Sequence, residues 1–493
     1  MKIAWIPTLF VMSSGLWAAA GPKVVALPSK SPLVTFRFVF LTGSASDPAD
    51  KPGVAALTAA MLAEGGTREM TYKEIVDAMF PMATSVSQQV DKEMIAFSGT
   101  THVDNLQAFY KIFRAMLLDP GWRQDDFSRL RDNAANYLRI SLRGNNDEEL
   151  GKEVLYSEIY AGRPYGHENA GAISALEKMT IADLQAFYRA HFTQANLIIG
   201  LAGGYPESFL NQVKEDFSKL PAGPPTAIGL PAPKPVRGIR MTLVEKNTRS
   251  VAYSIGFPID VKRGDPDFPA LLVAQSYLGQ HRLSGGRLYE RLRQARGLNY
   301  GDYAYIEYFP RGMFQFEPDP NLARRQQIFQ IWIRPVEPAT AHFALRLALY
   351  EFDKLVKEGL SEEAFQRTRT FLTKYVNLLT KTKRAELGYA SDSRYYGIPE
   401  YNSYLKSSLA KLTREDVNRA IRKHLGASGL DIVVVAKNCE ELKRKFIEGA
   451  PSPMIYNSPK PAEVMAEDKI VERWKIDVGA DAVRIVPVEK VFE

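Results

Sequence analysis

The chain of 493 residues is long enough for two or three domains with substantial cores. Its composition, with 45% hydrophobic and 24% charged residues, is that of an ordinary globular protein. A net charge of +7 is small for this length and comes with no long basic run, which argues against a nucleic-acid-binding protein. The single cysteine, Cys439, excludes an internal disulfide, and we interpret it as a small buried residue.

Residues 1–20 have the pattern of an export signal. Lys2 supplies a positive end, residues 3–17 are largely apolar, and three alanines at 18–20 fit a small-residue cleavage site before Gly21. A membrane anchor is the alternative interpretation, but the apolar run is short and serines interrupt it. No later segment is long and apolar enough to span a bilayer. We therefore expect a periplasmic protein with no membrane span once the signal is removed.

The first half of the chain alternates predicted strands and helices. Residues 33–41 place three phenylalanines on one face, which is typical of a strand. Pro52 then opens a helix that ends at Gly65 and Gly66. Arg-Pro-Tyr-Gly-His at 163–167 predicts a surface turn. Further elements are predicted as a helix over 105–118, a helix over 179–191 and a strand over 196–202.

The helix over residues 54–63 reads Val-Ala-Ala-Leu-Thr-Ala-Ala-Met-Leu-Ala, which by itself indicates a buried helix. It contains no histidine, cysteine or carboxylate side chain that could bind a metal ion. The six histidines of the chain include no pair closer than 24 residues, so no two of them could share one helical face toward a metal. Residues 133–146 contain no acidic residue, and Asp132 lies just outside this window.

An internal repeat indicates two domains. Lys178–His191 recurs 233 positions later as Lys411–His424, with Lys, Thr, Asp, Arg and His at matching sites and a predicted strand after each copy. We interpret the histidine that ends each copy as a helix-end residue and not as a metal ligand.

The domain boundaries follow from the linker between the halves. Residues 220–238 are rich in proline and predict a linker. They separate an N-terminal domain (21–219) from a C-terminal domain (239–447), and we expect the tail (448–493) to wrap the second domain.

Strands and helices are also predicted in the second half. Strands are predicted at 250–259 and 328–333, and helices at 338–357 and 361–380.

Residues 287–296 predict a further amphipathic helix, stopped by Gly297 and followed by a strand from Asn299 onward. The turn would bring Arg293 close to Tyr300, and a cation beside a phenol suits a peptide carbonyl or the oxyanion formed from it. Alternatively, Arg293 complements the helix dipole and Tyr300 packs in a sheet.

The sequence Arg-Leu-Tyr-Glu-Arg-Leu-Arg, followed after three residues by Gly-Leu-Asn-Tyr, resembles the signature in the C-terminal half of the pitrilysin/insulinase family of zinc peptidases, which are inverzincins. The resemblance implies that Arg293 and Tyr300 bind substrate at the metal site. It also aligns the alanine-rich helix with the family's His-x-x-Glu-His motif, where Ala56, Ala59 and Ala60 replace the first histidine, the glutamate and the second histidine. The surrounding frame is retained in Gly53, Met61, Leu62, Gly66 and Thr67.

Ser284, Gly285 and Gly286 precede the arginine helix. They predict either a mobile loop over a substrate or a plain loop leading into the helix.

The resemblance implies an α+β fold with two homologous αβ domains of the pitrilysin/mitochondrial-processing-peptidase type. It further implies a non-catalytic, substrate-positioning subunit of a heteromeric zinc metallopeptidase, inactive alone. No cofactor is expected in this chain. Zinc is expected in a homologous partner subunit with an intact His-x-x-Glu-His, and the substrate would be an unfolded peptide. The alternative is a metal-free peptide-binding or scaffold protein, and a self-sufficient zinc peptidase ranks third.

Overall fold

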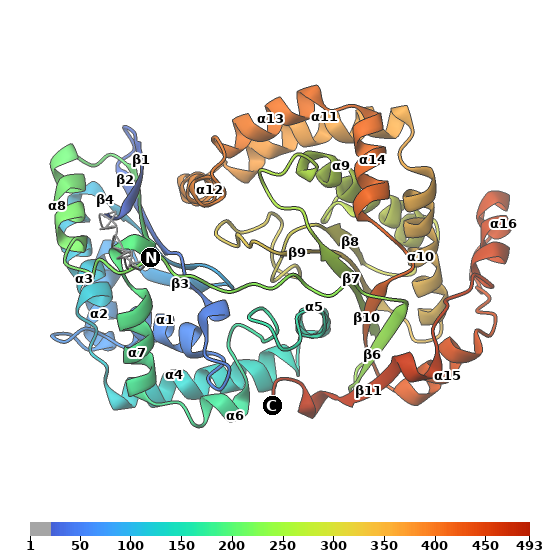
Figure 1. Cartoon of the computed structure of the whole chain (residues 1–493), viewed down its shortest axis with the longest axis horizontal. Coiled ribbons are helices and arrows are strands. Elements are labelled where there is room, and N and C mark those ends of the chain that lie inside the picture. The colour runs from blue at the N-terminus through green and yellow to red at the C-terminus, as the bar shows by residue number, and fades with distance from the viewer. Residues whose placement is uncertain (1–20) are drawn as a thin grey trace, which may run out of the picture.

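The structure is a computed structural model that describes residues 21–493, so the predicted signal peptide lies outside the described residues. The described chain folds into two halves, each built on one mixed sheet (Figure 1). The first half contains β1 (Lys23–Pro28), β2 (Leu33–Phe40), α1 (Val54–Glu64), α2 (Tyr72–Met79), β3 (Val86–Val90), β4 (Ile95–His102), α3 (Leu106–Leu118), α4 (Gln124–Asn136), the π-helical η4 (Tyr137–Leu142), α5 (Asp147–Ile159), α6 (Ile173–Leu176), α7 (Ile181–His191), β5 (Leu197–Gly203) and α8 (Glu207–Phe217).

The second half has a comparable series of elements. They are β6 (Ile239–Glu245), β7 (Val251–Ile259), α9 (Phe268–Gly279), the π-helical η6 (Tyr289–Gln294), β8 (Gly301–Tyr305), β9 (Gln327–Val336), α10 (Ala341–Glu358), α11 (Glu362–Leu379), α12 (Lys383–Tyr396), α13 (Tyr401–Lys411), α14 (Arg414–His424), β10 (Leu430–Ala436), α15 (Cys439–Glu448), α16 (Ala462–Val471) and β11 (Val483–Pro487).

The two sheets share one strand order. The first sheet runs β1-β5-β2-β4-β3, and the second runs β6-β10-β7-β9-β8 with β11 added outside β6. In both sheets the first pair of this order is parallel and the other three pairs are antiparallel. The repeat seen in the sequence therefore extends to the whole sheet, and the predicted α+β fold with two homologous halves is confirmed.

The repeated sequence segments form the equivalent helices α7 and α14, and the identical residues explain why. Thr180 accepts a hydrogen bond from the backbone N–H of Asp183, whose carboxylate accepts one from the backbone N–H of Thr180. Thr413 and Asp416 form the same reciprocal capping box in α14. Each box satisfies two N–H groups that a helix start otherwise leaves free.

One helix of each half packs on the sheet of the other half. Helix α5 of the first half packs on β7 and β10 of the second sheet, where Gly151 leaves room for the side chains of Ser254 and Val435. Helix α12 of the second half packs on β2 and β5 of the first sheet, where Leu387 lies against Gly200. The apolar core of the first half consequently includes residues of β10.

The linker and the tail both lie against structured parts of the chain. Residues 221–238 contain neither helix nor strand and run from one half to the other (Figure 1). In the tail, β11 pairs with β6 of the second sheet, in line with the predicted wrapping. The last residues return to the first half, where Arg143 donates to the carbonyl oxygen of Val491 (2.5 Å) and pairs with Glu493 (2.9 Å). The tail therefore contacts both halves.

Candidate functional site

Helix α1 begins at a strained glycine that the carboxylate of Asp47 supports. Gly53 has a φ of 101°, in the left-handed region that favours glycine. Asp47 accepts hydrogen bonds from the backbone N–H groups of Gly53 (2.6 Å) and Ala55 (2.9 Å). These contacts fix the start of the helix that carries Ala56, Ala59 and Ala60.

The metal positions on α1 do not fit a zinc ion. Ala59 is fully buried, whereas Ala56 and Ala60 are partly exposed. Methyl groups have no lone pair with which to bind zinc or activate water. Within residues 21–493, no three His, Cys, Asp or Glu side chains are grouped as metal ligands would be.

Arg293 and Tyr300 lie together on the second half. The helix predicted over 287–296 is present, but it contains the π-helical turn η6, and Gly297 ends it with a φ of 70°. The Cζ atom of Arg293 lies 4.1 Å from the ring centroid of Tyr300, and its Nη1 donates to the carbonyl oxygen of Tyr300 (3.2 Å). Tyr300 is 64% exposed. The stacked cation and phenol are thus available at the surface.

The loop at Ser284, Gly285 and Gly286 leads into this helix, and its first two residues are exposed. Just before it, Arg282 donates to the carbonyl oxygens of Gly312 and Met313, and its guanidinium lies 4.8 Å from the ring centroid of Phe316. The loop is therefore held against the segment that joins β8 to β9.

That segment, residues 306–326, is the main difference between the two halves. The equivalent connection in the first half, from β3 to β4, is only residues 91–94. We call residues 306–326 the insertion. Its Arg324 forms a buried bidentate ion pair with Asp91 of the first half, with Nε–Oδ2 of 2.8 Å and Nη2–Oδ1 of 2.5 Å.

Two further contacts also connect the insertion to the first half. The hydroxyl of Tyr308 donates to Glu153 (2.6 Å), and Arg325 pairs with Glu93 (2.6 Å).

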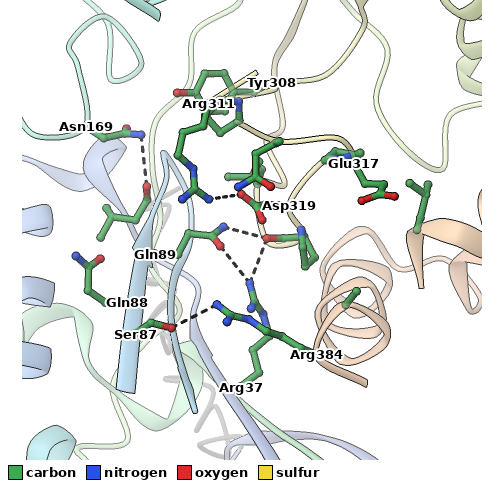
Figure 2. A pocket seen from close by; sticks show the side chains of 18 of the residues that line it. Arg37, Ser87, Gln88, Gln89, Asn169, Tyr308, Arg311, Glu317, Asp319 and Arg384 are labelled. Carbon is green, nitrogen blue, oxygen red and sulfur yellow. Dashed lines mark hydrogen bonds and ion pairs between the residues drawn. The ribbon is translucent and has the colours of Figure 1, made fainter. Parts of the chain in front are cut away.

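A cavity of about 800 Å³ opens between the two halves (Figure 2). The edge strand β3 forms one side, with Gln89 donating to the carbonyl oxygen of Pro320 (2.9 Å) and Ser87 accepting from Arg384 (3.3 Å). Its lining includes Arg37, Ala56, Gln88, Tyr137, Glu149, Glu168, Asn169, Arg311, Glu317, Asp319 and Lys381.

Buried charges in and around this cavity have shifted pKa values. Burial raises the pKa of Glu168 to about 8, with a contribution from the nearby Glu153. Burial also raises the pKa of Glu149 and lowers that of Lys92. The turn predicted at residues 163–167 is present, but Tyr165 within it and Glu168 directly after it are buried.

The structure separates the two sets of residues that the sequence singled out. Ala56 lines the cavity, whereas Arg293 and Tyr300 are not among its lining residues. Sequence reasoning missed the charged lining. One sequence feature that indicates a buried charge is Arg37, which interrupts the otherwise apolar strand β2. In the structure Arg37 is buried, and burial lowers its pKa to about 10. Another was the run Asp91-Lys92-Glu93 between two strands.

The geometry defines a class of protein: a two-domain α+β chain whose two sheets share one strand order and whose helix α1 carries no metal ligands. Residues 178–372 match a family model described as the peptidase M16 inactive domain. This match, together with relatives named zinc proteases, is consistent with a non-catalytic member of the pitrilysin family.

Three similar proteins illustrate the relationship. A crystal structure of a peptidase M16 inactive domain from Pseudomonas fluorescens matches with a TM-score of 0.75 and 22% identity, covering 85% of this chain and 96% of that one. The periplasmic protease PqqL from Escherichia coli matches with a TM-score of 0.66 and 15% identity, covering 93% of this chain and 50% of that one. A probable mitochondrial-processing peptidase subunit beta from Arabidopsis thaliana is 22% identical over 227 residues, covering 45% of this chain and 42% of the relative.

The chain spans about half the length of the curated relatives it matches. Several of those relatives are named uncharacterised zinc proteases. No helix within residues 21–493 combines the length and the apolar character needed to cross a membrane.

Proposed function

We propose that this chain is the non-catalytic, substrate-positioning subunit of a heteromeric periplasmic pitrilysin-family zinc metallopeptidase. It would supply Arg293 and Tyr300 in trans to the zinc site of a homologous partner with an intact His-x-x-Glu-His motif. The observation that carries the proposal is the contrast between α1, where methyl groups replace every metal-binding group, and the stacked, exposed pair at the end of η6.

The chemistry of the pair supports a role toward a peptide carbonyl. Arg293 makes no ion pair within residues 21–493 and uses one N–H on the carbonyl oxygen of Tyr300. Its remaining N–H groups and the Tyr300 hydroxyl are donors without a role in the packing of the core. Donors placed beside a peptide carbonyl stabilise the negative charge that develops on its oxygen during attack.

The relatives support the assembly and the compartment that we propose. One is named as a subunit of a processing peptidase, and one structural neighbour is named as a periplasmic protease. The predicted export signal agrees with the second of these. The zinc would be held by the partner alone, and an unfolded peptide would be the substrate.

The test begins with affinity capture of the tagged chain from a periplasmic extract, followed by a peptidase assay with and without a chelator. We expect a pitrilysin-family partner with intact zinc ligands and activity only in the mixture. Arg293→Ala or Tyr300→Phe should lower kcat of the complex by on the order of 10²–10³ while leaving the complex assembled. Arg394→Ala, at an exposed arginine of α12, is the matched control and should have no effect.

Other outcomes would redirect the proposal. Recovery of the chain without a zinc-binding partner, and without chelator-sensitive activity, would favour the metal-free peptide-binding or scaffold role. Wild-type turnover by both variants would mean that the pair is structural. One tightly held zinc per isolated chain would contradict the assignment of the metal to the partner.

A further inference from the structure

Helix α16 of the C-terminal tail binds the helical segment that carries Arg293. It lies beside α10 at the outer side of the second half (Figure 1). The guanidinium of Arg296 donates from Nε to Asp468 of α16 (2.8 Å) and from Nη2 to Glu467 (2.7 Å). The side chain of Arg296 is fully buried, and Asp468 is only 3% exposed. The contact therefore differs from a solvent-exposed ion pair, which would contribute little.

The same two carboxylates bind a second arginine and a phenol. Arg291 pairs with Glu467, so that one carboxylate joins Arg291 and Arg296. The hydroxyl of Tyr456 donates to the other oxygen of Asp468 (2.6 Å). Arg296 also donates from Nη1 to the backbone carbonyl oxygen of Arg291 (2.9 Å). Each carboxylate consequently accepts hydrogen bonds from two side chains.

The two arginines are five residues apart, a spacing that an ordinary α-helix places on different faces. With 3.6 residues per turn, positions five apart differ by about 140° around the axis. The π-helical turn η6 reduces this difference, because the backbone N–H of Ala295 donates to the carbonyl oxygen of Glu290, five residues earlier (3.0 Å). Arg291 and Arg296 can then reach the same carboxylate of Glu467. The contacts with the tail thus require the π turn.

Arg293 lies within this π turn. Its Cζ atom is 5.1 Å from the ring centroid of Tyr289 and 4.1 Å from that of Tyr300. The loss of the extra residue that a π turn contains would rotate the following residues by about 100°. Since the chain continues directly from the turn through Gly297 to Tyr300, such a change would move Arg293 and Tyr300 relative to each other.

We propose that Glu467 and Asp468 are positioning residues. They hold Arg291 and Arg296 in the π-helical register, and this register places Arg293 against Tyr300, where the pair can meet a substrate carbonyl. The C-terminal tail is then part of the substrate-positioning apparatus. The inference rests on the proposed function for its catalytic consequence, whereas the coupling of α16 to η6 is a property of the isolated chain.

The first experiment measures hydrogen–deuterium exchange in the isolated full chain. Glu467→Gln/Asp468→Asn keeps the side-chain shapes and removes both charges. We expect the backbone amides of residues 295–300 to exchange about 10–100-fold faster than in the wild-type chain, an effect of the size that one lost hydrogen bond to a charged group produces. Residues 328–333 of β9 should keep their wild-type rates. Glu463→Gln, at an exposed position one turn earlier in α16, is the matched control and should change neither segment.

Unchanged exchange of residues 295–300 would overturn the proposal. An increase that spreads equally over β9 would also overturn it, because it would mean a general loss of stability. If the variant with both substitutions does not fold, Glu467→Gln is measured alone, since this side chain is 13% exposed and its loss is less disruptive. It should produce a smaller increase in the same amides, and no increase there would contradict the proposal.

The second experiment uses the complex with its partner. Glu467→Gln/Asp468→Asn should lower kcat by roughly tenfold and leave KM nearly unchanged, because a displaced Arg293 weakens a contact made in the transition state. In an Arg293→Ala background the same substitutions should have no further effect on kcat, since they act through Arg293. Additive losses would limit the two acidic residues to a structural role and overturn the proposal. If exchange responds as expected but no peptidase complex can be obtained, the proposed function fails and the coupling of α16 to η6 stands, so the two failures are distinguishable.

Discussion

Removing the buried Arg324 side chain should weaken the fold more than removing any surface arginine. Arg324 and Asp91 are both buried, and two hydrogen bonds of 2.5 and 2.8 Å join them across the two halves. The guanidinium also lies 3.6 Å from the ring centroid of Tyr308. Arg324→Met keeps much of the volume but leaves the Asp91 carboxylate with the weaker donor Asn169 at 3.3 Å. An uncompensated buried charge of this kind costs about 3–5 kcal/mol.

The measurement is urea unfolding, followed by circular dichroism and by tryptophan fluorescence, with one free energy of unfolding assigned where the two curves coincide. Arg68→Met is the matched control, because the Arg68–Asp119 pair has a similar N–O distance of 2.8 Å but is exposed, and such pairs contribute about 0–1 kcal/mol. The double variant Asp91→Asn/Arg324→Met should recover part of the loss, since no buried charge remains unpaired. A free energy for Arg324→Met within about 1 kcal/mol of the wild-type value would refute this reasoning.

Three further outcomes follow from local geometry. Gly53→Ala should destabilise the chain by about 1–3 kcal/mol in thermal unfolding, because alanine disfavours a φ of 101° and its Cβ would lie 2.5 Å from the carbonyl oxygen of Ala170. Cys439, whose pKa burial raises to about 12, should react with a thiol reagent only after denaturation. Asp302→Asn should raise the melting temperature more at pH 8 than at pH 5, because a raised carboxyl pKa makes the wild-type chain lose stability as the pH rises toward 7.

Local patterns in the sequence predicted several principal elements of the fold. The alternation in residues 33–41 gives β2, and the helical spacing in residues 105–118 gives α3. The repeat of Thr180 and Asp183 as Thr413 and Asp416 identified two equivalent helices because these residues cap a helix through contacts that are only three positions apart. Interactions of such short range are visible in a single sequence.

The sequence did not reveal the exchange of α5 and α12 or the role of the insertion. Which sheet a helix packs on depends on partners far away in the chain, as with Gly151 and Ser254. The acidic residues at the start of α5 resemble an ordinary solvated first turn, yet Glu148 and Glu149 are buried and contact Arg334 and Arg311 of the second half. The sequence could predict that Arg293 lies near Tyr300 because one turn joins the two residues. It could not predict the cavity, because residues from both halves line it.

The two halves are connected far more strongly by packing than by the proline-rich linker. Each sheet is covered by a helix from the other half, so separation at residues 220–238 would expose the faces of β7 and β10 on one side and of β2 and β5 on the other. The insertion adds the buried Arg324–Asp91 ion pair and the partly exposed Arg325–Glu93 ion pair across the same boundary. The relative orientation of α1 and η6 is therefore part of one cooperative structure. That structure leaves Tyr300 exposed and outside the cavity that Ala56 lines, which is the arrangement that the proposed action of the pair on a second protein needs.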